Sequence, residues 1–117
     1  MYYNNQTMYC SAIEQTTDGI ILIPNREVKN LINAQTYRLI ICNNVSAEEN
    51  LPVFIRTNVG DIPVLCKAGN TMYANQLDTR TRYPIIYGSM NENYVNGQFV
   101  ILSRVSPRSA IAPVESI

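Results

Sequence analysis

The residue types that most often carry catalysis are sparse in this sequence. Its 117 residues include no histidine, which excludes the Ser-His-Asp and Cys-His arrangements and the metal sets that use imidazole. A catalytic carboxylate pair of the glycosidase type is still possible. The acidic residues, however, fall mostly in turns and polar ends, as Glu48 and Glu49 do in SAEEN. Neither standard Gly-rich phosphate-binding spacing occurs. We therefore expect no catalytic residues, no metal site and no cofactor.

The cysteines also favour a structural role. Cys10, Cys42 and Cys66 are an odd number, they are widely spaced, and no CxxC pair occurs among them. Cys42 and Cys66 lie inside apolar runs, where a reduced thiol behaves as a small hydrophobic residue. We expect free, structural thiols.

The segment LDTRTRYPIIY, residues 77–87, sets two arginines one residue apart. If it is extended, successive side chains face opposite sides. One face then holds Leu77, Thr79, Thr81, Tyr83, Ile85 and Tyr87, and the other holds Asp78, Arg80, Arg82, Pro84 and Ile86. Paired arginines can clamp a phosphate or carboxylate. They are equally compatible with a solvated face or with a contact to another subunit, where arginine is enriched.

Composition narrows the range of partners. Nine basic and nine acidic residues cancel, so no net charge attracts nucleic acid or an anionic membrane, and we expect neither as a partner. No apolar run reaches the length of a membrane helix, and the polar start MYYNNQTMYC lacks the features of a signal peptide. Charged residues make up 15% of the chain, against about 25% in typical soluble domains. Asn, Gln, Ser, Thr and Tyr must therefore cover much of the surface.

The apolar runs have the length of strands and are separated by Gly, Pro and Asn. They cover residues 19–24, 37–43, 52–57, 61–67, 82–88 and 98–104. Turns are predicted at 58–60, 68–70 and 96–97, where Asn and Gly tolerate positive φ. The pattern predicts an all-β domain, an antiparallel β-sandwich or barrel of about six to eight short strands. Ile40 and Phe54 are expected in its core.

The rest of the chain divides into a helix candidate and two arms. Val28, Leu31 and Ile32 have helical spacing, which predicts at most one short helix near 26–33. We expect an N-terminal arm over 1–18, the β domain over 19–102 and a C-terminal arm over 103–117. Eight tyrosines stand against two phenylalanines and no tryptophan, and tyrosine suits partly wet interfaces. Tyr2, Tyr3 and Tyr9 of the first arm are therefore predicted interface residues.

Residues 52–102 carry a resemblance to known proteins. An apolar strand and a Gly turn lead to IPVLCKAGN, then YANQLDTRTRYPIIYG and a closing FVIL strand. This order resembles small structural proteins of tailed bacteriophages and prophages of Firmicutes-type hosts. The resemblance implies a β-rich, non-enzymatic virion protein, such as a decoration or head protein, assembled in the host bacterial cytoplasm. It implies contacts with other virion proteins such as the major capsid protein, homo-oligomers, and a subunit-facing row that includes Asp78, Arg80, Arg82 and Tyr83.

An alternative function remains open. The tyrosines and the Asn-rich loops 43–50 and 89–97 are also compatible with a β-sandwich module that binds carbohydrate or another surface ligand. In that case Tyr94 is the residue whose loss should weaken binding.

Overall fold

Short runs rich in aliphatic and β-branched residues form the strands, because such side chains pack well on a pleated surface. The computed structural model describes residues 6–42, 51–79, 81–89 and 94–105. Within them lie seven strands, β1 (Gln6–Gln15), β2 (Ile20–Pro24), β3 (Thr36–Ile41), β4 (Val53–Thr57), β5 (Gly60–Leu65), β6 (Tyr83–Gly88) and β7 (Gln98–Ile101), and a short 3-10 helix, η1 (Ala74–Gln76). The all-β prediction and its strand number are confirmed.

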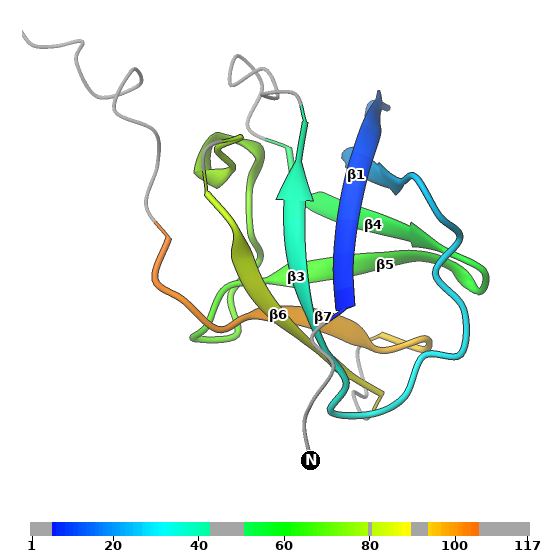
Figure 1. Cartoon of the computed structure of the whole chain (residues 1–117). Helices are drawn as coiled ribbons and strands as arrows, with labels where there is room; N and C mark the ends of the chain where they lie inside the picture. Colours follow the sequence, from blue (N-terminus) through cyan, green and yellow to red (C-terminus); the bar gives the residue numbers. More distant parts are fainter. Residues whose placement is uncertain (1–5, 43–50, 80, 90–93, 106–117) are drawn as a thin grey trace, which may run out of the picture.

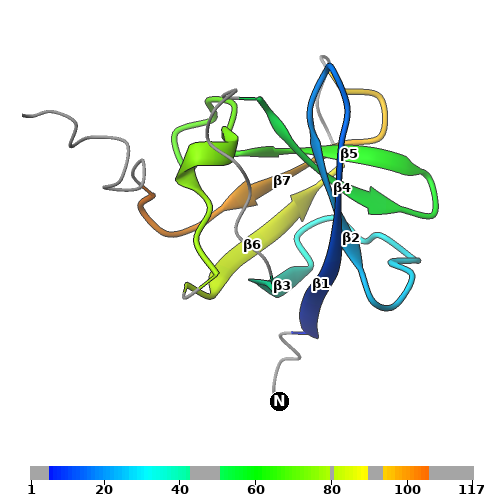
Figure 2. The same ribbon diagram turned by 90° about the horizontal axis from the view of Figure 1, so that it is seen from above.

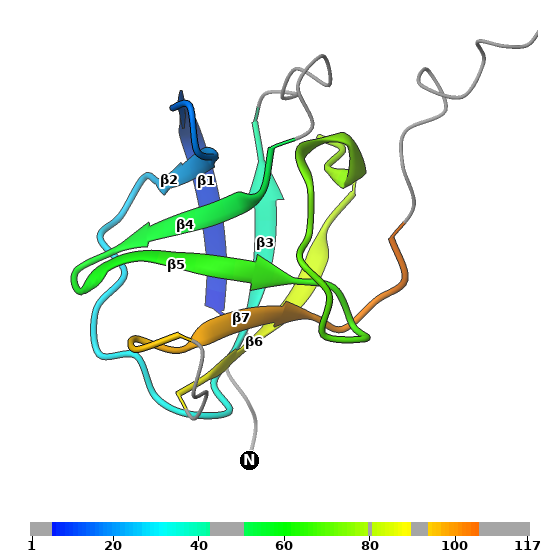
Figure 3. The same cartoon turned by 180° about the vertical axis from the view of Figure 1, so that it is seen from behind.

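The strands close into a barrel in the order β1-β2-β4-β5-β7-β6-β3 (Figure 1, and from behind Figure 3). Four neighbouring pairs are antiparallel, as predicted. The pairs β1–β3, β2–β4 and β5–β7 are parallel, so the expectation of a purely antiparallel fold is wrong. β1 and β3 are parallel because β2 carries the chain back to the end at which β1 begins, and the loop 25–35 then leads into β3 at that same end.

The expected N-terminal arm is also corrected. Residues 6–15 form β1, which pairs with both β2 and β3 and is therefore an integral strand of the barrel. Its inward residues Met8 and Cys10 are buried, whereas Tyr9 between them and Thr7 before them are exposed. The sequence of a strand with only a few inward apolar residues resembles that of a polar arm, because the partner strands are not known from the sequence.

No helix forms near 26–33 among the described residues. The segment belongs to the loop 25–35, in which Asn30 and Ala34 have φ values of 56° and 72°. These left-handed conformations are incompatible with a right-handed helix. Val28 nevertheless faces the core, as its apolar character suggested.

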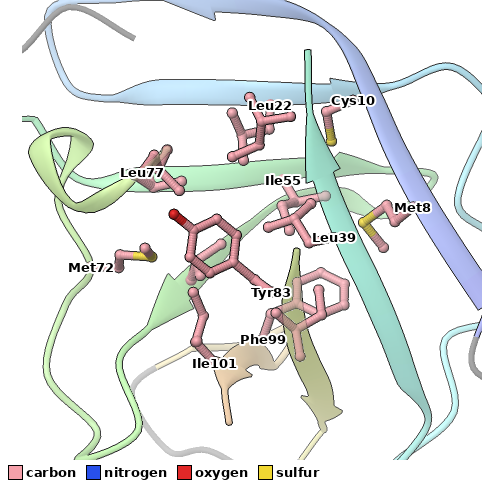
Figure 4. Close-up of a cluster of buried hydrophobic side chains, with 14 of the residues drawn as sticks. Met8, Cys10, Leu22, Leu39, Ile55, Met72, Leu77, Tyr83, Phe99 and Ile101 are labelled. Carbon is pink, nitrogen blue, oxygen red and sulfur yellow. The ribbon is translucent and has the colours of Figure 1, made fainter. Parts of the chain in front are cut away.

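Inward and outward side chains alternate along the strands, and the inward ones fill the barrel. Figure 4 shows Met8, Leu22, Leu39, Ile55 and Phe99 among the side chains that meet in the interior. Ile40 and Phe54, expected in the core, are only half-buried. Their neighbours along the strands, Leu39 and Ile41 in β3 and Val53 and Ile55 in β4, take the inward positions. β3 and β4 are core strands, as predicted, but Ile40 and Phe54 lie on their outward faces.

The two ends of the barrel are closed differently. The segment 66–79, which contains η1, contributes the buried residues Met72, Ala74 and Leu77 at one end. At the other end the ring of Phe99 makes edge contacts with Tyr37 and Tyr87, with ring centroids 5.9 and 5.5 Å apart. Burial, and to a smaller degree Tyr87, raises the pKa of Tyr37. The interior is therefore packed and not a channel.

Candidate functional site

A cleft of about 780 Å³ lies between the first half of β1 and the loop 25–35. Residues 6–9 form one wall and residues 24–30 the other, while Ile32, Gln35 and Tyr37 complete the lining. In Figure 2 the loop after β2 stands away from the start of β1. The volume lies within the range of about 300 to 1,000 Å³ usual for binding sites.

The cleft exists because β1 is longer than β2. The pairing between them starts at Cys10 and Pro24 and continues to Gln15 and Ile20, so residues 6–9 pair with β3 alone. Pro24 ends β2 at this point, and proline has no N–H to extend the ladder. One edge of residues 6–8 therefore faces the cleft instead of another strand, and at Tyr9 this edge meets the backbone of Asn25.

Backbone groups on this edge can be identified from the hydrogen bonds around it. The Cys42 N–H donates to the Cys10 carbonyl on the β3 side, and the Asn25 N–H donates to the Tyr9 carbonyl on the opposite side. Because direction alternates along a strand, Thr7 points its backbone groups the same way as Tyr9. Among the described residues, the Thr7 N–H, the Thr7 carbonyl and the Tyr9 N–H have no backbone partner.

The outer wall of the cleft is held in place by backbone hydrogen bonds. The Asn25 N–H reaches the Tyr9 carbonyl at 2.9 Å, and the Asn58 N–H reaches the Val28 carbonyl at 3.0 Å. Further along, the Ala34 N–H donates to the Tyr87 carbonyl at 2.8 Å. The loop is thus fixed to β1, to the β4–β5 turn and to β6, which sets the width of the cleft.

The chemistry of the lining suits binding. Among the described residues that line the cleft, Arg26, Glu27 and Lys29 carry the charges, and all three are exposed. The remaining lining is made of amide groups, Thr7, the tyrosines Tyr9 and Tyr37, and apolar side chains. A single carboxylate without a second acid or a base offers no general acid–base pair. Backbone groups that have no backbone partner among residues 6–42, 51–79, 81–89 and 94–105 are the most distinctive feature of this site.

Apolar side chains are exposed on three loops on the same side of the barrel. Ile32, Val59 and Val95 have exposed fractions of 59%, 48% and 95%, and we call them the apolar loop cluster. The loops are joined by the Asn58–Val28 hydrogen bond and by one from the Asn96 side-chain amide to the Val59 carbonyl, at 3.2 Å. Figures 1 and 3 show the loop 25–35, the β4–β5 turn and the turn before β7 on this side.

The remaining polar clusters of the described residues are structural. Arg56 on β4 bridges Glu14 at 3.2 Å and Asp61 at 3.1 Å on the barrel surface. The hydrogen bond to Asp61 and the charge of Asp61 raise the pKa of Arg56 above its ordinary value. An exposed network of this kind contributes little to stability.

The cysteines are free in the structure. Burial, and to a smaller degree Cys42, raises the pKa of Cys10 to about 12. Burial also raises the pKa of Cys66. In the described part of the chain, no three His, Cys, Asp or Glu residues are grouped so that they could hold a metal ion.

The predicted interface residues do not form one row. Tyr9 is 40% exposed on β1, and it lines the cleft. Asp78 and Arg82 lie in the segment before β6, and β3 separates β1 from β6 in the barrel. Tyr83 is 2% exposed and points inward, so its place in an outward row is corrected. β6 begins only at Tyr83. Before it the Thr81 N–H donates to the Asp78 carbonyl, as in a turn, so the extended alternation assumed from Leu77 onward does not hold.

Some predicted residues lie outside the described ones, namely Tyr2, Tyr3 and Arg80, the loop 43–50 and part of the loop 89–97. Tyr94 is half-buried beside Val95 of the apolar loop cluster. Sequence reasoning missed Thr7, Arg26 and Lys29 as residues of one cleft. No signal in the sequence identifies them, because the part of β1 that extends beyond its hairpin with β2 is known only from the structure.

Comparisons with protein-family models, with curated proteins and with solved structures gave no match for this chain. Within the residues that the structure describes, no helix has both the length and the apolar character needed to cross a membrane.

Proposed function

We propose that this chain is a non-enzymatic structural subunit of a bacteriophage particle, a capsid-associated protein of the decoration or head type. The observation that supports an assembly role is the apolar loop cluster. Ile32, Val59 and Val95 are exposed on three neighbouring loops that hydrogen bonds hold together. Apolar side chains exposed on neighbouring loops are typical of protein contact surfaces. The phage context follows from the resemblance of residues 52–102.

Two further features support a role without catalysis. The lining of the cleft offers backbone groups, amides and a tyrosine ring, but no acid–base pair. The chain is electrically neutral, so its contacts with a shell would depend on apolar and hydrogen-bonded groups and would be only weakly sensitive to salt.

The proposal is tested on particles. Phage or prophage particles are induced in a strain that carries the gene, purified by density gradient and examined by mass spectrometry. We expect this chain in a constant ratio to the shell protein across the particle fractions. Its absence from purified particles would overturn the proposal.

A variant with charges in the apolar loop cluster makes the test specific. Val59→Asp combined with Val95→Asp should lower the amount of the chain in purified particles. The matched control is Thr17→Asp, which adds a charge at an exposed position of the β1–β2 turn. Equal incorporation of both variants would show that the cluster is not the contact surface.

The cleft favours a second candidate, a carbohydrate-binding module. Amide side chains and an exposed tyrosine ring, here Tyr9, are groups that orient a polar ligand. Binding to a glycan array that is lost in Tyr9→Ala and retained in Tyr94→Ala would support this candidate and would place the ligand in the cleft.

A further inference from the structure

A buried tyrosine hydroxyl group belongs to the lining of the cleft. Tyr37 is 6% exposed, and its ring packs edge-on against Phe99. The hydroxyl group makes no hydrogen bond with the residues that the structure describes, and its oxygen is not fully enclosed by protein. Since Tyr37 lines the cleft, this oxygen meets the solvent there. Buried tyrosine hydroxyl groups usually have a hydrogen-bond partner, and a ligand in the cleft can supply one here.

The outer wall of the cleft carries an excess of positive charge. Arg26 and Lys29 lie on this wall with Glu27 between them in the sequence, and all three are exposed. In the described part of the chain both ion pairs involve Arg56, so Arg26 and Lys29 are available to a ligand. A carboxylate matches the planar fork of an arginine, and lysine adds a second positive charge.

The inner wall offers groups that suit a sugar ring. The Thr7 N–H and carbonyl face the cleft without a backbone partner among the described residues, but at Tyr9 the edge already meets Asn25. One residue's backbone groups are too few for an added strand. They suit hydroxyl groups, each of which can donate and accept a hydrogen bond. The Tyr9 ring is 40% exposed and presents an apolar face to the C–H groups of a sugar.

We propose that the cleft binds an acidic sugar, a glycan unit whose ring carries a carboxylate. This inference rests on the carbohydrate-binding candidate named above, and it specifies the charge of the ligand and the groups that hold it. Arg26 and Lys29 hold the carboxylate from the outer wall. The Thr7 backbone and the Tyr37 hydroxyl group bond to hydroxyl groups of the sugar, and the Tyr9 ring packs against its face.

The first experiment compares acidic glycans with neutral copies of themselves. The full chain is applied to an array of glycans that contain uronic or sialic acids, and to the same glycans after reduction of each carboxylate to a primary alcohol. The strongest binder and its reduced form are then compared by calorimetric titration. Reduction should weaken binding by about tenfold or more, because it removes charge-assisted hydrogen bonds. Added salt should weaken binding of the acidic form only.

A pair of double variants tests the positive wall. Arg26→Gln combined with Lys29→Gln should weaken binding of the acidic glycan by about tenfold or more and leave binding of its reduced form nearly unchanged. The matched control is Lys67→Gln combined with Arg104→Gln. It removes the same charge from exposed positions outside the lining of the cleft, and it should change affinity by less than about twofold.

The Tyr37 hydroxyl group is tested by Tyr37→Phe. Because the hydroxyl group has no hydrogen-bond partner among the described residues, its loss should leave the free energy of unfolding nearly unchanged. Binding of the acidic glycan and of its reduced form should both weaken, by about twofold to tenfold. Lower stability with unchanged binding would show that the hydroxyl group acts within the fold and not on the ligand.

Several outcomes would overturn the inference. They are no binding of any acidic glycan, equal binding of acidic glycans and their reduced forms, or equal binding by the two double variants. If the reduced forms bind equally well and Tyr9→Ala abolishes binding, the carbohydrate-binding candidate stands and only the charge of the ligand is wrong. Each outcome is independent of whether the chain is found in purified particles, so failure here is distinct from failure of the virion role.

Discussion

The hydroxyl group of Tyr83 donates a hydrogen bond to the backbone carbonyl of Gln76 at 3.2 Å. The same oxygen accepts a hydrogen bond from the Asp78 N–H at 2.7 Å. The first residue of β6 thus fixes the end of η1 from inside the barrel. The segment 66–79, which closes this end of the core, is therefore held in one defined position.

Loss of this hydroxyl group should destabilise the protein. Tyr83→Phe keeps the buried ring but leaves the Gln76 carbonyl and the Asp78 N–H without this partner, at a cost of about 1 to 3 kcal/mol. Urea unfolding measures the change. Tyr9→Phe, at an exposed position of β1, is the control and should leave the free energy of unfolding nearly unchanged. Equal stabilities of the two variants would show that the hydroxyl group does not hold the segment.

The aromatic contact at the other end of the barrel should contribute more. Phe99 is fully buried between Tyr37 and Tyr87, so Phe99→Ala should cost about 3 to 5 kcal/mol. Phe54→Ala removes the same ring from a half-buried, outward position and should cost clearly less. Thermal and urea unfolding compare the two variants. A larger loss for Phe54→Ala would contradict the assignment of inward and outward faces in β4.

Gly97 should be less tolerant of a side chain than Gly69. Both have positive φ, 88° and 93°, so replacement by alanine strains the backbone of each by about 1 to 2 kcal/mol. At Gly97 an added Cβ would also collide with the Gly88 carbonyl and the Tyr87 hydroxyl group, whereas at Gly69 it would meet open space. Gly97→Ala should therefore lower the melting temperature more than Gly69→Ala. Equal shifts would rule out the collision.

The buried thiol of Cys10 should make stability depend on pH in alkaline solution. Burial raises its pKa from 9.0 to about 12 in the folded state. Above 9.0 the unfolded chain loses the thiol proton while the folded chain keeps it, so unfolding becomes more favourable as pH rises. The contribution is fully present below pH 9.0 and is lost progressively between 9.0 and about 12.

Comparison with Cys10→Ala isolates this contribution, because the tyrosines titrate in both proteins. The unmodified chain should lose stability more steeply above pH 9.0 in denaturant titrations. Identical slopes would show that Cys10 is not buried as described. In agreement with its burial, Cys10 should also resist a thiol reagent that modifies the half-exposed Cys42 and Cys66 in the folded protein.

The sequence predicted most of what is local in this fold. The run VFIRT, the Asn-Val-Gly turn and the following DIPVL predicted a hairpin, and β4 and β5 form it with Thr57 opposite Gly60. The parallel pairs were not predicted, because the choice of a distant partner depends on how all seven inward faces pack together. The helix near 26–33 was wrong because one or two turns with helical spacing are too short to decide a conformation.

The cleft was beyond sequence reasoning for a related reason. Nothing in residues 6–9 distinguishes a strand with two neighbours from a strand with one. The difference depends on the end of β2 at Pro24 and on the position of the loop 25–35. This position is fixed by hydrogen bonds from the loop to β1, to the β4–β5 turn and to β6. Such an edge becomes visible only when partner strands and their lengths are known.

The order of strands around the barrel has a consequence for synthesis. The first five strands form a sheet in the order β3-β1-β2-β4-β5, and β6 and β7 join its two outer strands. Until residues 83–101 have left the ribosome, the edges of β3 and β5 therefore stay unpaired and the apolar inner face stays open. Unpaired edges are templates for pairing with other chains. Because the barrel closes only when β6 and β7 are added, the chain must be completed quickly if it is to fold before it aggregates.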